Sequence, residues 1–208
     1  MGRWVRLSIV GGAVVALVAA GILVTRSTSQ AATCDYWIGG SGNFNAPVNW
    51  STGVVPNSAD DACITQTTSS TPPAAADTYT VLFDGISTVN SLQLGAPSGK
   101  QTLQLAGNNT QFFLNTGTIN SNGILLVGDG NVSNGYTWLG AASNTSVLTN
   151  NGSLETVQGG GGIRYLRVSI TNAAGGTVDI AAPDTRVDGF GSSLYTTKIG
   201  RASCRERV

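Results

Sequence analysis

The chain has 208 residues with eleven basic and eleven acidic side chains, and it contains no histidine. The missing histidine excludes Ser-His-Asp and Cys-His catalysis and the usual zinc sites. Residues 32–197 hold four basic and ten acidic side chains, which gives a net charge of 4 − 10 = −6. This negative charge argues against a nucleic-acid partner, because binding to phosphates needs clustered lysine and arginine.

Residues 1–31 are typical of a targeting segment. Arg3 and Arg6 precede an uncharged apolar stretch at 7–24, and the small residues around Ala31 are typical of a cleavage site. The apolar stretch is long for a signal peptide and lies at the lower limit for a transmembrane helix. We expect a cleaved signal peptide, with a retained membrane anchor as the alternative. In both cases the positive charges before the stretch place the rest of the chain outside the cell.

Residues 34–64 combine two tryptophans, four glycines and two cysteines in one short unit. An even number of cysteines in an exported chain predicts a disulfide bond between Cys34 and Cys63, with two free buried thiols as the alternative. The pair does not form a C-x-x-C redox motif. We therefore expect a structural bond that closes a loop.

From residue 78 onward, short segments alternate apolar and polar residues between turns rich in glycine, asparagine and serine. This alternation is typical of an all-β protein, and no stretch after Val24 shows a helical period. The predicted strands are 79–83, 89–95, 102–107, 111–115, 124–128, 136–140, 146–150, 153–157, 164–171, 177–181 and a segment near Val187.

Three of these segments share one plan: an apolar residue, a short asparagine and glycine corner, and then a strand. They begin at Ile119, Leu148 and Ile170, which lie 29 and 22 residues apart. Irregular spacings of this size favour the coils of a β-solenoid, in which asparagines at the corners can hydrogen-bond along the stack. We predict a single-stranded parallel β-helix over 78–197, with a β-sandwich as the alternative.

Motif-like residues cover the start of this region. They read W-x-G-G at 37–40, N-W-S-x-G-x-x-P at 49–56, an acidic pair at Asp60 and Asp61, and V-x-S-L-x-L-G at 89–95. This opening resembles secreted β-helix proteins of the adhesin and autotransporter-passenger type, and a glycine-patterned extracellular domain opens similarly. The resemblance extends over about 37–180, although only 37–95 is motif-like. It implies an extracellular β-rich module and no particular reaction.

The first coil of a solenoid exposes a strand edge and an apolar cross-section, which invites association between molecules. We expect residues 32–77 to form a cap that closes this end. The disulfide Cys34–Cys63 would staple the cap, and Trp37 and Trp50, with Phe44, would fill it.

The candidate chemistry is sparse. Asp179, Asp184, Arg186 and Asp188 lie close together in the sequence, and β-helix enzymes use carboxylates beside a basic residue for acid–base work on acidic polysaccharides. We prefer to interpret the group as surface charge at a corner, and keep Asp184, Arg186 and Asp188 as weak candidates for a polysaccharide site. No catalytic residue, metal ligand or cofactor site is predicted.

Two other pairs are assigned to faces by their spacing. Tyr136 and Trp138 are two residues apart and therefore share a face, where they stack on a sugar ring or pack against neighbours. Arg164 and Arg167 are three residues apart and therefore point to opposite sides. The segment 95–101 faintly resembles a phosphate-binding loop, but it is too short and is interpreted as a turn.

The last eleven residues, KIGRASCRERV at 198–208, hold four of the eleven basic residues and the third cysteine, Cys204. This string resembles the in-frame translation of a sequencing adapter, and a natural basic tail is the alternative. On the first interpretation the tail is artefactual and the solenoid is truncated near Thr197.

We therefore expect an exported, extracellular or cell-surface β-solenoid that serves as a surface, adhesion or matrix module without catalytic activity of its own. The expected partners are extracellular polysaccharide or surface proteins, and the membrane only through residues 7–24 if these are not cleaved. The alternative is the N-terminal part of a β-helix polysaccharide hydrolase or lyase.

Overall fold

A computed structural model describes residues 33–66, 77–130, 135–141, 145–159 and 162–187 of the chain. The expected signal or anchor segment, Asp188 and the tail 198–208 lie outside the described residues. The strands are β1 (Cys34–Tyr36), β2 (Gly42–Asn43), β3 (Asp61–Ile64), β4 (Tyr79–Phe83), β5 (Ile86–Leu94), β6 (Gln101–Leu105), β7 (Thr110–Ile119), β8 (Gly123–Val127), β9 (Tyr136–Leu139), β10 (Val147–Asn150), β11 (Ser153–Thr156), β12 (Ile163–Leu166), β13 (Ser169–Asn172), β14 (Thr177–Ile180) and β15 (Thr185–Val187).

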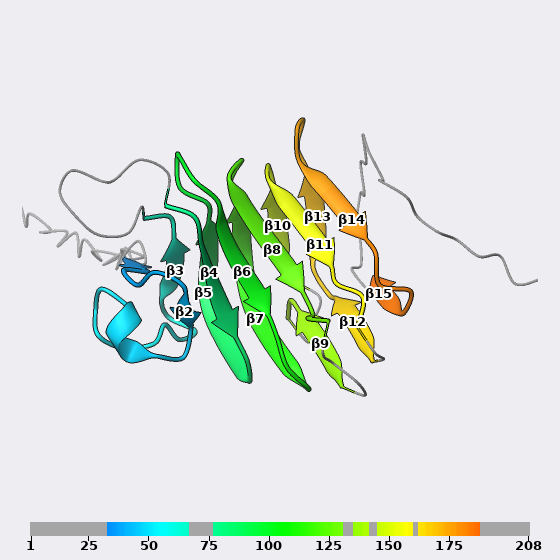
Figure 1. Cartoon of the computed structure of the whole chain (residues 1–208), viewed down its shortest axis with the longest axis horizontal. Coiled ribbons are helices and arrows are strands. Elements are labelled where there is room, and N and C mark those ends of the chain that lie inside the picture. The colour runs from blue at the N-terminus through cyan, green and yellow to red at the C-terminus, as the bar shows by residue number, and fades with distance from the viewer. Residues whose placement is uncertain (1–32, 67–76, 131–134, 142–144, 160–161, 188–208) are drawn as a thin grey trace, which may run out of the picture. The chain divides into compact units, whose positions relative to one another are not determined.

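The described part is a β-solenoid of about five turns, in which the strands stack in chain order (Figure 1). All ladders between these strands are parallel, which excludes the β-sandwich alternative. Helix is limited in the described residues to one 3-10 turn, η1 (Pro47–Asn49). No helix in this part of the chain is long and apolar enough to span a membrane.

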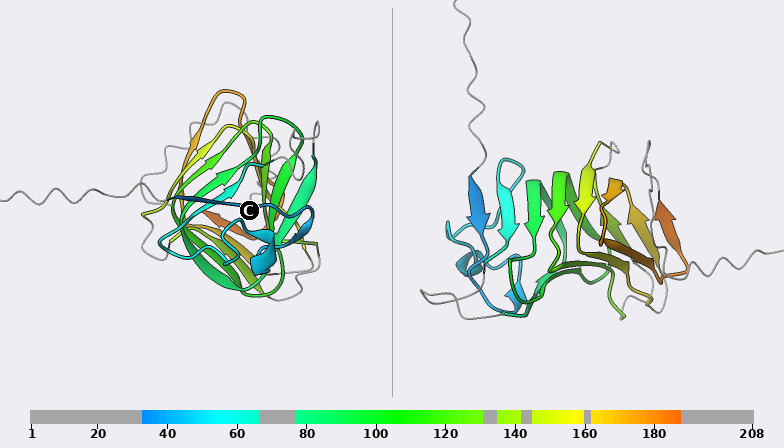
Figure 2. Two further views of the ribbon diagram at one scale, coloured as in Figure 1. Left: turned by 90° about the vertical axis from the view of Figure 1, so that its left-hand side faces the viewer. Right: turned by 90° about the horizontal axis from the view of Figure 1, so that it is seen from above.

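Two sheets form the walls of the solenoid, and the coils lie over one another when viewed along the stack (Figure 2). The smaller sheet has the order β14-β11-β8-β6-β4-β2. The larger sheet has the order β1-β3-β5-β7-β9-β12-β15, and β10 and β13 continue it from the second half of β7. The ladder between β5 and β7 is interrupted between the pairs Val89–Leu114 and Ser91–Thr116. The larger sheet therefore has two halves, and each full coil crosses three wall segments.

Apolar residues of successive coils form columns inside the solenoid. One column of the smaller sheet places equivalent side chains of five strands directly over one another: Val81, Leu103, Leu125, Leu154 and Val178. All five are buried. Because side chains alternate between the two faces of a strand, the predicted alternation of apolar and polar residues becomes an apolar inside and a polar outside.

An aromatic cluster lies at the start of this core. The rings of Trp37 and Trp50 meet edge to face at 5.2 Å, and Phe44 packs against Trp50 at 4.8 Å. Phe44 also contacts Phe83 at 5.2 Å and Phe112 at 5.5 Å, so the cluster reaches into the next coils. The Trp50 Nε1 donates a hydrogen bond to the Phe44 carbonyl at 2.7 Å. The structure thus buries Trp37 and Trp50 together with Phe44 in the first coil.

The predicted disulfide is confirmed. Cys34 and Cys63 are bonded, with their Cα atoms 5.8 Å apart. Cys34 lies opposite Asp61, and Tyr36 lies opposite Cys63, so the bond runs diagonally between two adjacent parallel strands. β1, β2 and β3 are absent from the sequence-based strand assignment, although β1 and β3 belong to the same sheet as β5.

Of the two equivalences predicted between repeats, one is confirmed and one is wrong. Leu148 lies opposite Ile170, as expected. Ile119 instead lies opposite Asn150, so the predicted equivalence of Ile119 and Leu148 is wrong by two residues. The reason is corner length: Ile124 lies opposite Ser153, so the corner after Ile119 is two residues longer than the corner after Asn150.

The segment 164–171, which was predicted as one strand, forms two. β12 ends at Leu166 and β13 begins at Ser169, with the bend of the larger sheet between them. A Cβ on Gly140, whose φ is 103°, would collide with the Arg167 carbonyl. The backbones are therefore too close at this bend for any residue but glycine at that position.

Buried asparagines stack at one corner, as the sequence predicts. The Asn150 Nδ2 donates hydrogen bonds to the Asn172 Oδ1 at 2.7 Å and to the Thr177 carbonyl at 2.8 Å. The Asn172 Nδ2 donates to the Gly176 carbonyl at 2.8 Å. These amides satisfy backbone groups that the turning chain would otherwise leave unpaired.

Replacing Cys34 and Cys63 together by serine should lower the free energy of unfolding by about 3–4 kcal/mol, because the unfolded chain gains the entropy of an open loop. Thermal unfolding of the oxidised wild type and the double variant, with and without a reductant, measures the effect. A reductant should shift the wild type alone, and an equal shift in both proteins would contradict the assignment.

Replacing Asn150 by alanine should cost about 1–3 kcal/mol, because the Thr177 carbonyl and the Asn172 amide oxygen lose their donor inside the protein. Urea unfolding followed by circular dichroism measures the loss. Asn151, the next residue, is the matched control, and Asn151→Ala should change stability far less. Equal effects of the two variants would contradict the role given to the buried stack.

Candidate functional site

The first half of the larger sheet carries aromatic and arginine side chains on its outer surface. On β7, β9 and β12 the residues that alternate with these side chains are buried, such as Phe112, Leu139 and Leu166. The alternation therefore turns the intervening side chains outward. We call this surface the outer aromatic face; it consists of Phe113, Tyr136, Trp138, Tyr165, Arg167 and Arg186.

Strand register brings this set together from four strands and one bend. Trp138 of β9 lies opposite Tyr165 of β12, which lies opposite Arg186 of β15. Gln111 of β7 lies opposite Trp138 on the other side. The strands β7, β9, β12 and β15 are successive neighbours in the sheet, as their order in Figure 1 shows.

The rings form one continuous cluster. The centroids of Trp138 and Tyr165 are 5.4 Å apart with 35° between the ring planes. Tyr136 lies 6.3 Å from each of them, and Phe113 lies 6.0 Å from Trp138. The Tyr136 hydroxyl accepts a hydrogen bond from the Gln111 Nε2 at 3.0 Å. These cross-strand contacts stabilise the sheet and fix the positions of the rings.

Two guanidinium groups lie against this cluster. The central guanidinium carbon of Arg167 is 4.2 Å from the centroid of Trp138 and 5.9 Å from that of Tyr165. The guanidinium of Arg186 is 5.7 Å from the centroid of Tyr165. Both distances to Tyr165 lie within the range of cation–π attraction. The aromatic rings therefore hold two positive charges on one outer surface.

The described residues of the acidic group at 179–188 lie on both sheets and at a corner. Arg186 joins the outer aromatic face, whereas Asp184 is an exposed residue before β15 whose carbonyl accepts a hydrogen bond from the Arg164 backbone N–H. Asp179 lies on β14 in the other sheet, opposite Glu155. Asp188 lies outside the described residues. Within the described residues, no three His, Cys, Asp or Glu side chains are grouped so that they could hold a metal ion.

Arg164 and Arg167 point to opposite sides, as their spacing predicts. Arg164 is only 1% exposed and lies inside the solenoid, where its Nη2 donates to the Asp129 carbonyl at 3.4 Å. Burial lowers the pKa of the Arg164 guanidinium, and attraction to Asp129 and Asp184 opposes that shift. The group stays protonated, because arginine does not lose its proton in proteins.

The corner at Gly128 is built around this buried cation. Gly128 has a φ of 103°, and a Cβ at this position would collide with the Arg164 Nε. Arg164 also continues a polar column inside the solenoid, since it lies opposite Thr137 on one side and Thr185 on the other. Arg164 is therefore a structural residue beneath the outer aromatic face.

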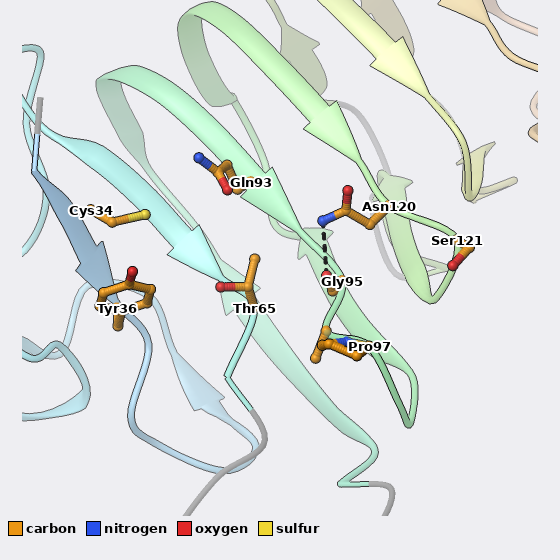
Figure 3. A pocket seen from close by; sticks show the side chains of 9 residues that line it. Cys34, Tyr36, Thr65, Gln93, Gly95, Pro97, Asn120 and Ser121 are labelled. Carbon is orange, nitrogen blue, oxygen red and sulfur yellow. Dashed lines mark hydrogen bonds between the residues drawn. The ribbon is translucent and has the colours of Figure 1, made fainter. Parts of the chain in front are cut away.

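A shallow hollow of about 400 Å³ lies elsewhere, beside the second half of the larger sheet (Figure 3). Tyr36, Thr65, Gln93 and Asn120 surround it, and the Asn120 Nδ2 donates to the Gly95 carbonyl at 2.9 Å. None of the residues that line the hollow is charged. It offers hydroxyl and amide contacts but no acid or base.

No family model, curated protein or solved structure matches this chain. The resemblance to secreted adhesins therefore stays a prediction, while the β-solenoid fold that it implied is confirmed. The outer aromatic face has to be interpreted from its own geometry and chemistry.

Part of this face follows from the sequence. The spacing of Tyr136 and Trp138 predicts that they share a side of the strand, but it does not join Phe113, Tyr165 and Arg167 to them. A signal was present, because each of the three successive strands carries an aromatic residue at an outward position. The sequence alone does not show that these aromatic residues are neighbours, because the register depends on the number of residues in each corner, and the corners differ in length.

Replacing Arg164 by methionine should lower the free energy of unfolding by about 1–3 kcal/mol, since a hydrogen bond from a charged group is lost inside the protein. Denaturant unfolding measures the change. Arg186→Met is the matched control because Arg186 is exposed on the next strand of the same ladder. If the exposed variant were destabilised as much as the buried one, the structural role of Arg164 would be wrong.

Proposed function

We propose that this chain is an extracellular surface, adhesion or matrix module that binds its ligand through the outer aromatic face and has no catalytic activity of its own. The observation that carries the proposal is the cluster of four rings and two guanidinium groups on the outside of the stacked strands. Aromatic and arginine side chains are the types most enriched in binding surfaces.

The rigidity of the support favours binding. The rings project from strands rather than loops, and each strand is held by parallel partners on its sheet. A surface whose side chains are already fixed loses little conformational freedom when a ligand arrives, which improves affinity. Phe113, Trp138 and Tyr165 hold each other through ring contacts before any ligand is bound.

An extracellular location is consistent with the disulfide. Cys34–Cys63 is a bond between two strands of the sheet and lies outside any C-x-x-C motif. Structural disulfides of this kind form and persist in oxidising compartments. The bond supports export, and the targeting segment predicted at 1–31 supplies the route.

A catalytic alternative has one supporting observation. Asp129 and Asp184 both lie beside Arg164, because their carbonyl groups accept hydrogen bonds from its Nη2 and from its backbone N–H. Paired carboxylates carry out the acid–base chemistry of polysaccharide-degrading enzymes. Arg164 itself is buried, however, and cannot reach a polymer on the outside.

Attachment of the full chain to immobilised polysaccharides and matrix proteins tests the proposal. We expect retention on at least one of these surfaces, and a loss of about tenfold in affinity for the double variant Trp138→Ala/Tyr165→Ala, which removes the centre of the ring cluster. Thr118→Ala/Thr149→Ala, on the second half of the larger sheet, is the control and should bind like the wild type.

The same mixtures serve for a catalytic assay. Release of reducing ends or of unsaturated sugar from any polysaccharide would favour the enzyme alternative. Equal binding by the wild type and the ring variant would contradict a role for the outer aromatic face.

A further inference from the structure

We infer that the outer aromatic face recognises a carboxylate-bearing polysaccharide, with Arg186 and Arg167 pairing with carboxylate groups and with Tyr136 and Tyr165 contacting the sugar rings. This inference rests on the proposed function and names the ligand class of the same surface.

The distribution of charge is the first argument. The described residues include nine acidic side chains and four basic ones, the latter being Lys100, Arg164, Arg167 and Arg186. Arg164 is inside the solenoid and Lys100 lies at a distant corner before β6. The two remaining cations both lie against Tyr165. Within the described residues, which are otherwise acidic, the outer aromatic face is therefore the cationic surface, to which an anionic chain is steered while the surrounding acidic side chains repel it.

The identity of the cations is the second argument. A guanidinium group is planar and donates in a fixed fork that matches the two oxygens of a carboxylate. Arg167 and Arg186 are positioned by ring contacts at 4.2 and 5.7 Å, so that part of their side-chain freedom is already lost. A carboxylate meets these groups with a smaller entropic penalty than it would meet a free lysine.

The covered ring face of Trp138 favours a charged sugar over a neutral one as the ligand. An indole that binds neutral glycans needs an open ring face, but the guanidinium of Arg167 lies 4.2 Å over the Trp138 ring. The Trp138 Nε1 is also buried and forms no hydrogen bond. A sugar cannot stack on Trp138 without displacing a cation. The guanidinium groups, rather than the indole, are therefore the primary contacts.

The arrangement along the stack favours a polymer over a small anion. Trp138, Tyr165 and Arg186 occupy successive strands in one register. Neighbouring strands are about 4.7–4.9 Å apart, so the contacts are spread along the solenoid rather than gathered at one point. The one hollow described above lies beside the other half of the sheet and contains none of these residues. An extended ligand with repeated carboxylates matches this line of contacts.

Binding of the full chain to three polysaccharides tests the inference: polygalacturonate, its methyl-esterified form and uncharged dextran. Biolayer interferometry on immobilised polymer gives each affinity at low and at physiological salt. We expect binding to polygalacturonate that weakens as salt is added. Methyl esterification removes the charge but keeps the sugar, and it should lower the affinity about tenfold or more.

Variants separate a specific contact from general charge. Arg186→Ala and Arg167→Ala should each weaken binding to polygalacturonate about tenfold, the loss of one charge-assisted contact. Arg186→Lys keeps the charge and should restore the affinity only in part, because the fork is lost. Lys100→Ala removes the same unit of charge away from the face and should bind like the wild type. Circular dichroism and thermal unfolding of each variant check the fold.

Each outcome has a defined meaning. Equal binding to polygalacturonate, its ester and dextran would overturn the carboxylate inference while leaving the proposed binding module intact. An equal loss for Lys100→Ala and Arg186→Ala would also overturn it, since net charge alone would then explain binding. Attachment to matrix proteins without binding to any polysaccharide would overturn the inference but not the proposed function. Failure to attach to any surface would contradict both.

Discussion

Parallel stacking in one register is the constraint on which this fold depends. It places equivalent residues of successive coils directly over one another, so an inward column needs the same kind of residue in each coil, apolar in the main core and polar at Arg164 and Asn150. The column that runs from Val81 through Leu103 and Leu125 meets this demand. Coils can differ in length only where the extra residues stay in the corners. Thus 22 residues separate Leu103 from Leu125, but 29 separate Leu125 from Leu154. The inside is fixed by stacking, and the corners and outer surfaces are free to differ.

One strand links stability to the outer surface. In β12 the buried Arg164 and the outward Tyr165 are consecutive residues. The Arg164 side chain donates to the Asp129 carbonyl and fills the space beside Gly128. A change inside this corner therefore moves the strand that holds Tyr165 between its two arginines. The buried cation Arg164 therefore directly precedes Tyr165, the ring that both outer cations contact.

The sequence was sufficient for features set by local periodicity. Alternation over 79–83 and 153–157 predicts strands there because a period of two is a property of one strand alone. The opposed directions of Arg164 and Arg167 follow from the same local rule. Register does not, because it depends on the number of residues in each corner, and the equivalence of Ile119 and Leu148 failed for this reason. The outer aromatic face needed that register, since its members come from different coils. Asp184 and Arg186 are neighbours in sequence, yet a corner and a strand start separate their roles.

The diagonal disulfide also has a mechanical meaning. Tension on the backbone just before Cys34 passes through covalent bonds to Cys63, and so enters the stack at β3. The loop between the two cysteines, with its buried tryptophans, carries none of this load. The hydrogen bonds between β1 and β3 are likewise shielded, because the sulfur bridge already holds the strands together. The first ladder to bear force is the one between β3 and β5, through its pairs Cys63–Gln93 and Ile64–Leu94. Reduction of this single bond would move that point of loading back to β1 and its ladder with β3.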